Sequence, residues 1–491
     1  MTDLRCPLLL IAGVLGIALS GCAGPSAEPS ASLDTFTDHL DARLPALMDR
    51  YDVPGATLAL VRAGEPVWTG AYGWADREQG RPMTTDALFR AESISKPVTA
   101  WGVMRLVDQG HVGLDDPVQQ HLGDWTLPAS EVDAQPITIR HLLSNSAGLA
   151  LGTIGEEYAP GSDVPPLRNY LTREVERIRP PGSAFAYSNA GFNLLQLLIE
   201  SVTGRDFAAH MAEDVLRPLG MERAHFAWSD SLRPAVPMGY ELDGTPVPPY
   251  VYPAQASGGL WASADAIARF VAAEVARPDS ARSVLDAASL RTLHTPQIAI
   301  PGLFGFVADA YGLGHFIETL PDSGPAIWHG GQGHGWMTHF HAVPATGDGI
   351  VILTNSQRSW PLMAHVLTDW ARWSGIGSVK MGRITTATTA LHVLIGFLGL
   401  MALAQAVRLG RGLLRGTRRW APLASTNWRR RSLQMALSLG VLTALAWMAA
   451  QPYLMVSSIF PRAAGWAGIA LFGLACLGFL SALFPPMNSK A

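Results

Sequence analysis

One lysine and the serine three residues before it are the first candidates for chemistry. Only three of the 36 Lys and Arg residues are lysines, namely Lys96, Lys380 and Lys490. Arg keeps its proton in proteins, whereas a desolvated Lys can lose it and act as a base. Residues i and i+3 share a helix face, so Lys96 can reach Ser93 and take its proton. The pair predicts acyl transfer, and a solvated surface lysine is the alternative for Lys96 alone.

A second polar cluster is Tyr187-Ser188-Asn189, between the turn at 180–182 and an apolar run. A Tyr where a loop meets a helix can point its phenol into a cleft and relay a proton. Capping of the helix by Tyr187 and Asn189 is the alternative interpretation.

A third cluster is Trp328-His329-Gly330-Gly331-Gln332. Two consecutive glycines on an edge strand would let a substrate backbone approach closely. A turn with a packed aromatic residue is the alternative. The sequence carries no Walker A loop, no H-E-x-x-H and no G-x-S-x-G, so these motifs give no reason to expect a nucleotide, a metalloprotease zinc or a nucleophile elbow.

Together and in this order, the three clusters resemble the motifs of the serine β-lactamase and penicillin-binding-protein superfamily, especially its class C-like branch. The resemblance covers about residues 33–355. It includes Ile137–Leu149, Arg217–Met221, Ser257–Ala262 and Val351–Asn355. It implies an α+β fold, with an antiparallel sheet flanked by helices, an all-helical lobe beside it, and the active site between them.

The resemblance also implies roles for individual residues. Ser93 would attack a carbonyl and become acylated, while Lys96 and Tyr187 share the transfer of its proton to the leaving group. Asn189 would bind substrate or orient Lys96. The backbone N–H groups of Ser93 and Gln332 would form the oxyanion hole. The strand with Gly331 would lie along the substrate, and no cofactor is expected.

His329 departs from the pattern, because many relatives have a lysine there. A lysine is a permanent cation suited to a substrate carboxylate, whereas histidine is mostly neutral at pH 7. Small esters, amides or internal peptide bonds therefore gain weight as substrates over β-lactams and C-terminal D-alanine. His329, His334, His339 and His341 lie close in sequence, but no Asp, Glu or Cys ligand accompanies them, and we expect no metal site.

The predicted function is therefore a membrane-anchored serine hydrolase acting on amide or ester bonds through an acyl-enzyme on Ser93. Its substrates would be peptidoglycan-type peptides, β-lactams or small esters. An esterase of the same fold is one alternative, and an acylatable penicillin-binding sensor without turnover is another. A dead hydrolase domain is disfavoured, because Ser93, Lys96 and Tyr187 are intact.

These residues must be positioned by a domain of residues 33–378, with strands at both ends and helices between them. Strands near both termini predict one antiparallel sheet with a helical insert. Helices are expected over Leu33–Tyr51, Ser93–Gln109, Ile137–Leu143, Asn189–Val202 and Asp265–Val275, and strands over Gly55–Ala63, Pro66–Gly73, Gly312–Thr319, Ile327–His329, Trp336–Val343 and Gly349–Thr354.

The rest of the chain is apolar and basic. Residues 1–382 hold 25 basic and 40 acidic residues, whereas residues 383–491 hold 11 basic residues and no acid. Apolar runs predict transmembrane helices at 384–407, 433–455 and 463–484. Eight arginines in the loop 408–432 predict that this loop is cytoplasmic, which places the hydrolase domain outside the cytoplasmic membrane. No soluble basic domain suggests a nucleic-acid partner.

The N-terminus predicts an exported, lipid-anchored protein. Residues 1–22 have a short apolar segment ending in Leu19-Ser20-Gly21-Cys22, which resembles a bacterial lipobox. Acylation of Cys22 is expected, and ordinary signal cleavage or an uncleaved anchor are the alternatives. Residues 23–32 form a short tether. Anchoring at both ends of the domain favours substrates at the outer face of the membrane, such as membrane-linked cell-wall precursors.

Overall fold

The computed structural model describes residues 31–132, 135–152, 156–276, 284–302, 304–321, 323–422, 427–451 and 455–486. The predicted signal segment and Cys22 lie outside the described residues. The chain divides into two compact units, one over Ala27–Arg383 and one that contains the helices after Ile384.

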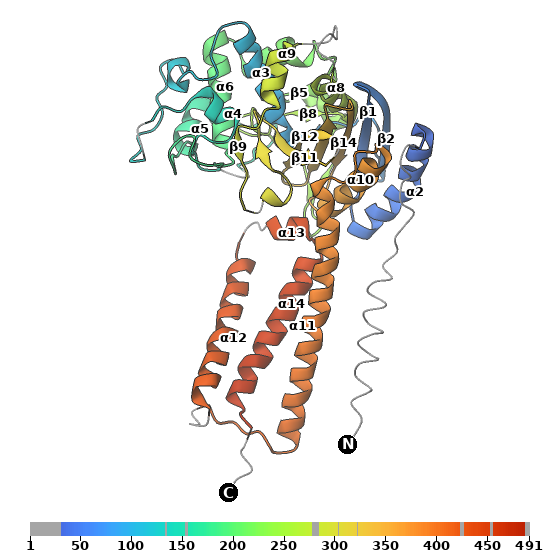
Figure 1. Ribbon diagram of the computed structural model, residues 1–491, viewed down its shortest axis with the longest axis vertical. Coiled ribbons are helices and arrows are strands. Elements are labelled where there is room, and N and C mark those ends of the chain that lie inside the picture. Colours follow the sequence, from blue (N-terminus) through green and yellow to red (C-terminus); the bar gives the residue numbers. More distant parts are fainter. Residues whose placement is uncertain are drawn as a thin grey trace. The chain divides into compact units, whose positions relative to one another are not determined.

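The first unit is built on a nine-stranded antiparallel sheet, in the order β3-β2-β1-β14-β13-β12-β11-β10-β9 (Figure 1). Early and late segments meet in its centre, where β1 pairs with β14 and Leu58 lies opposite Ile352. The strands are β1 (Gly55–Arg62), β2 (Glu65–Asp76), β3 (Arg81–Pro82), β9 (Ile298–Ala299), β10 (Ala310–Tyr311), β11 (Phe316–Leu320), β12 (Gly324–Gln332), β13 (Met337–Val343) and β14 (Asp348–Thr354). The predicted antiparallel sheet, formed by strands near both ends of the domain, is confirmed.

Both faces of the sheet are covered, because its central strands are apolar on both sides. Every residue of β13 is buried. Helix α8 (Ala264–Glu274) packs on β1 and β14, and α10 (Trp360–Trp373) packs on β14 and on α2 (Leu33–Tyr51). Continuous burial rather than alternation is what a strand covered on both faces requires.

The helical lobe surrounds α3 (Ser95–Asp108), which follows the nucleophile candidate and is almost wholly buried. Helix α3 contacts α6, α7 and α9. The other lobe helices are α4 (Ile139–Leu143), α5 (Leu167–Glu174), α6 (Asn189–Thr203), α7 (Phe207–Met211) and α9 (Ala287–Leu293). The α+β class predicted from the resemblance is confirmed, with the lobe beside the sheet (Figure 1).

Local chemistry places the ends of α6. The Ser188 hydroxyl accepts the Gly191 N–H at 3.0 Å, which satisfies one of the free donors of the first turn. The helix ends at Gly204, whose φ of 66° suits a residue without Cβ. Because Ser188 is the cap, Asn189 in the first turn keeps its side chain for another partner.

The second unit contains three helices, among the described residues, that are long and apolar enough to cross a membrane. They are α11 (Arg383–Leu414), α12 (Trp428–Ala449) and α14 (Ala463–Leu483). Helix α12 ends before the predicted boundary at 455, and a short helix α13 (Met455–Ile459) follows. Helices α11 and α12 also extend into the predicted arginine loop, so Arg408 and Arg429 are helical.

Candidate active site

Ser93 and Lys96 come together where a 3-10 turn becomes a helix. Ser93 lies in η1 (Glu92–Ile94), and the α-helix begins at Ser95 rather than at Ser93 as predicted. The Lys96 amine donates to Ser93 Oγ at 3.0 Å, to Asn189 Oδ1 at 2.8 Å and to the Ser257 carbonyl at 2.8 Å. Three acceptors satisfy the three N–H donors of the protonated form of Lys96 and hold its nitrogen beside the hydroxyl.

Burial makes this lysine a candidate base. Lys96 has no exposed surface. Desolvation lowers its pKa to about 7, while the negative charge of Glu92 opposes that shift. At neutral pH much of Lys96 is therefore a free amine within hydrogen-bond distance of a hydroxyl.

Tyr187 completes the polar group around Ser93. The Lys96 amine lies 4.9 Å from the centroid of the Tyr187 ring. Burial raises the pKa of Tyr187, and a hydrogen bond with Ser93 acts in the opposite direction. Tyr187 is therefore a neutral phenol at pH 7, better suited to relay a proton than to take one first.

The third cluster lies on β12, and its expected place on an edge strand is wrong. Strand β12 is paired on both sides, with β11 and with β13. Its pairing with β11 ends at Trp328, however, so residues 329–332 extend beyond β11 and are paired only with β13. The free edge is thus local, formed because one neighbouring strand is short.

Gly331 is required by the close approach of β12 to the segment before Ser93. A Cβ added there would lie 2.3 Å from the Ala91 carbonyl and 2.2 Å from Thr338 Oγ1. Thr338 in turn donates to the Ala91 carbonyl at 2.7 Å. Glycine therefore lets β12 pack against the segment that precedes Ser93. Gln332, one residue later, accepts the Trp360 indole N–H at 3.1 Å through its side chain.

His329 is fully buried, and both of its ring nitrogens are in hydrogen bonds. Nδ1 donates to the Gly330 carbonyl at 2.9 Å, which leaves Nε2 to accept from the Tyr311 hydroxyl at 3.1 Å. Burial, with the nearby charge of Lys96, lowers the pKa of His329 well below its usual value. The position where the resemblance implies a lysine is therefore held by a neutral side chain.

Comparison with known proteins agrees with this geometry. A sequence profile described as Beta-lactamase matches residues 40–372, more than half of the chain.

The chain belongs to the beta-lactamase family.

Among its relatives in this family, Esterase EstB of Burkholderia gladioli is 30% identical over 385 residues, which cover 67% of this chain and 94% of that protein. Penicillin-binding protein 4 of Amycolatopsis lactamdurans is 29% identical over 65% of this chain and 84% of its own length. The chain is therefore a serine hydrolase of the beta-lactamase family, as the motifs predicted.

Solved structures show the same fold. The octameric penicillin-binding protein homologue from Pyrococcus abyssi matches with a TM-score of 0.58 at 25% identity, over 68% of this chain and 76% of that one. A class C beta-lactamase matches with a TM-score of 0.56 at 19% identity, over 67% of this chain and 94% of its own. The fold class predicted from the motifs is confirmed.

A residue that the sequence reasoning missed lies directly before the nucleophile candidate Ser93. Glu92 is buried and has a φ of 50°, in the left-handed region. Its carboxylate accepts from Arg90 Nε at 2.7 Å, from the Tyr250 hydroxyl at 3.0 Å and from the Tyr252 hydroxyl at 3.1 Å. A charged residue adjacent to Ser93 was the available signal.

Arg90, the partner of Glu92, is held among aromatic rings. Its guanidinium carbon lies 4.2 Å from the Tyr250 centroid, 4.3 Å from Tyr252 and 4.8 Å from Trp261. It also donates to the carbonyls of Tyr250 and Gly258. Buried charges are tolerated when they are paired and hydrogen-bonded in this way, so the pair braces the backbone next to Ser93.

Aromatic side chains form a wall beside Tyr187. The rings of Phe304 and Phe316 stack against Tyr187 with centroids 6.2 Å away, and Phe304 lies 6.1 Å from Phe316. Phe185 contacts both Phe304 and Phe316. This face of the site offers apolar surface rather than charge.

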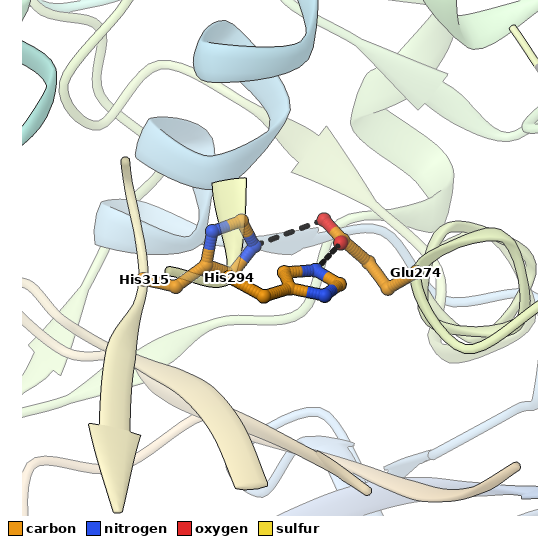
Figure 2. Close-up of side chains that lie close together, drawn as sticks. All are labelled: Glu274, His294 and His315. Carbon is orange, nitrogen blue, oxygen red and sulfur yellow. Dashed lines mark hydrogen bonds and ion pairs between the residues drawn. The ribbon is translucent and has the colours of Figure 1, made fainter. Parts of the chain in front are cut away.

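The described residues contain one group whose side chains converge as metal ligands could, Glu274, His294 and His315 (Figure 2). His294 Nε2 lies 2.5 Å from one carboxylate oxygen of Glu274, and His315 Nε2 lies 2.9 Å from the other. Two ligands about 2.0 Å from a tetrahedral zinc would be about 3.3 Å apart. These distances fit direct hydrogen bonds better than a zinc ion.

The Glu274 group instead braces the helix that follows Ser93. The Trp101 indole on α3 donates to Glu274 at 2.6 Å, and His315 Nδ1 donates to the Leu313 carbonyl at 3.0 Å. Burial alone would raise the pKa of Glu274, but the two histidines more than offset it and lower it to about 2. The carboxylate is therefore charged at neutral pH and links α8, α9 and α3.

Of the histidines that lie close together in sequence, His339 and His341 stack with ring centroids 5.8 Å apart, whereas His334 has carboxylate partners of its own. His334, 39% exposed, bonds to Glu157 at 2.9 Å and to Glu241 at 2.8 Å. The hydrogen bond that His334 donates to Glu157 contributes most to raising the pKa of His334 to about 9. His339 and His341 are buried under α10, where His341 lies 3.2 Å from Glu318.

Proposed function

We propose that the chain is a membrane-anchored hydrolase that cleaves esters or amides of uncharged acyl groups through an acyl-enzyme on Ser93. The observation that carries the proposal is the buried Lys96 amine, which has a pKa of about 7 and lies 3.0 Å from Ser93 Oγ. A base with this pKa suits proton transfer near neutral pH.

The reaction proceeds in two halves. Lys96 takes the Ser93 proton while Oγ attacks the substrate carbonyl, and the N–H groups of Ser93 and Gln332 stabilise the oxyanion. The proton then passes through Tyr187 to the leaving alcohol or amine as the carbonyl–heteroatom bond breaks. Water, deprotonated by the Lys96 and Tyr187 pair, then attacks the acyl-enzyme and releases the acid. One oxyanion donor lowers the barrier by about 3 kcal/mol.

The neutral third motif supports uncharged acyl substrates. His329 carries no charge at neutral pH and is committed to Tyr311 and Gly330, so it offers no cation to a substrate carboxylate. The aromatic wall supports the same choice. The relative Esterase EstB is an esterase by name, and the structural relative EstCE1 is described as a hydrolase with promiscuous acyltransferase activity.

Cell-wall peptides and β-lactams are the second candidate substrates. Penicillin-binding protein 4 is 29% identical to this chain, and that relative supports a penicillin-reactive site. In this case the site would either turn over such substrates or stay acylated and act as a sensor.

The hydrolase unit would lie outside the cytoplasmic membrane. The support is the run of arginines in the last turns of α11 and just after it, at Arg408, Arg411, Arg415, Arg418 and Arg419. The positive-inside rule assigns that end of the helix to the cytoplasm. The start of α11, and the hydrolase unit before it, would then be extracytoplasmic, with acylation of Cys22 as a second anchor.

A substrate panel on the purified full chain tests the function. p-Nitrophenyl esters, nitrocefin and D-Ala-D-Ala peptides should give their highest kcat/KM with the esters. A stable acyl-enzyme without turnover would support the sensor, and preferential hydrolysis of nitrocefin or the peptides would replace the ester proposal.

A fluorophosphonate probe tests the nucleophile. It should label the wild type and the control Ser183→Ala, whose serine is exposed, but not Ser93→Ala. Labelling of Ser93→Ala at full strength would show that another serine reacts.

A further inference from the structure

The aromatic wall of the active site ends in a turn with an exposed ring. The 3-10 turn η5 (Phe304–Phe306) carries Phe304, which stacks against the catalytic candidate Tyr187. Two residues later, the Phe306 side chain is 42% exposed. A single exposed ring is common on protein surfaces, so the meaning of Phe306 depends on what lies beside it.

The same turn is bound by the last residues before the first apolar helix. Arg383 donates to the Phe306 carbonyl at 3.0 Å, and its guanidinium carbon lies 5.7 Å from the Phe306 ring centroid. The Lys380 N–H donates to Glu318 at 2.9 Å, and the Lys380 amine bonds to Asp309. Four contacts thus tie residues 380–383 to η5 and its surroundings, all within the hydrolase unit.

The chain continues from Arg383 directly into the run that we expect to span the membrane. Ile384 is the next residue, and no Asp, Glu, Lys or Arg follows until Arg408. A residue spans at most about 3.5 Å, so the contact with Arg383 keeps Phe306 within a few residues' reach of the start of this run. Segments that lie in the membrane interface combine basic residues with Trp, Phe or Leu.

We propose that η5 is the membrane-facing lip of the active site, and that the substrate is an ester or amide whose acyl chain is held in the lipid bilayer. Phe306 would contact the outer leaflet, and Phe304 would guide the apolar chain from the bilayer to Ser93. This inference rests on the proposed hydrolase function and adds the physical state of the substrate.

Two esters with one leaving group test the proposal. The full chain is reconstituted in vesicles of phosphatidylcholine and phosphatidylglycerol. The rates are measured with 4-methylumbelliferyl palmitate, which partitions into the bilayer, and with the water-soluble 4-methylumbelliferyl acetate. The quantity compared is the ratio of the palmitate rate to the acetate rate. We expect Phe306→Ser to lower this ratio at least about 10-fold, and Phe306→Leu to keep it near the wild-type value.

The matched control is Trp74→Ser, because Trp74 is 46% exposed but lies on β2, four strands from β12 in the sheet order. This variant should keep the wild-type ratio. Fluorophosphonate labelling of Ser93 shows that each variant is folded. If wild type and Phe306→Ser hydrolyse both esters with the same ratio, the membrane-facing role of η5 is wrong, while the proposed ester hydrolysis stands. Failure of the wild type to hydrolyse either ester overturns the proposed ester hydrolysis and the lip with it.

Discussion

At the scale of single residues, the site depends on how burial and charge set the protonation of Lys96. The amine is shielded from water, which favours its neutral form, while the Glu92 carboxylate favours the cation. Their balance leaves a base that works near pH 7. Tyr187, whose pKa burial raises, keeps its proton at the same pH and can pass one on.

Replacing Lys96 with arginine tests whether its proton is lost during turnover. Lys96→Arg keeps a positive charge but cannot act as a base, so kcat/KM should fall at least about 100-fold. In the wild type, kcat/KM should rise with pH through about 7, because only the deprotonated amine accepts the Ser93 proton. Near-normal turnover in Lys96→Arg would mean that the lysine is only a structural cation.

Removing the charge of Glu92 should change both the pH profile and stability. Because the carboxylate holds the pKa of Lys96 up, Glu92→Gln should move the acidic limb of the kcat/KM profile to lower pH. It should also lower the free energy of unfolding by about 3 kcal/mol, since Arg90 stays buried without a counter-charge. The exposed Glu222→Gln is the control. If Glu92→Gln loses stability but keeps the pH profile of the wild type, the role of Glu92 is only structural.

At the scale of elements, the position of Ser93 and Lys96 depends on what surrounds α3. The helix contacts α6, α7 and α9, and Trp101, five residues after Lys96, bonds to Glu274 on α8. The turn before β11 also approaches closely, because a Cβ on Gly314 would lie 3.3 Å from the Lys96 carbonyl. The catalytic turn is therefore held by segments from the lobe and from the sheet.

The charge on Glu274 should make this brace sensitive to acid. Its pKa is about 2 in the folded chain, against an ordinary value of 4.5. A carboxyl with a depressed folded pKa stabilises the fold above its unfolded pKa, and this contribution is lost as the pH falls from about 4.5 to about 2. It amounts to something on the order of 3 kcal/mol.

Glu274→Gln should therefore unfold at a lower urea concentration than wild type at pH 7, measured by tryptophan fluorescence of the full chain in detergent. The gap should narrow as the pH falls from 5 to about 2. Glu222→Gln should show no such gap. A difference that stays constant with pH would mean that packing, rather than the charge, is lost.

At the scale of the whole molecule, the hydrolase unit and the apolar helices are joined through Arg383. The three apolar helices make membrane association the simplest account of the basic tail. The proposed orientation rests on the arginines alone.

A reporter fusion series tests that orientation. Alkaline phosphatase, which is active only outside the cytoplasm, should be active when fused after Gly375 and inactive when fused after Arg419. The reverse pattern would place Ser93 in the cytoplasm and remove the support for substrates at the outer membrane face.

Local patterns in the sequence were sufficient to predict much of this protein. Helical spacing places Ser93 and Lys96 on one face, and this contact spans only three residues. Apolar runs locate the three helices that are long and apolar enough to span a membrane, and α2 has the predicted bounds, Leu33–Tyr51. Such features depend on neighbours within a few turns of the chain, so composition and periodicity reveal them.

Only the tertiary structure decided which distant residues meet. The Glu92 carboxylate binds Tyr250, 158 residues away, and Arg383 binds Phe306, 77 residues away. Strand β12 lies inside the sheet rather than at the predicted edge, because it pairs with β11 and β13. Burial of His329 and the pKa of Lys96 likewise follow from the packing around them. Periodicity along the chain carries no information about such partners, because they are chosen by the folding of the whole domain.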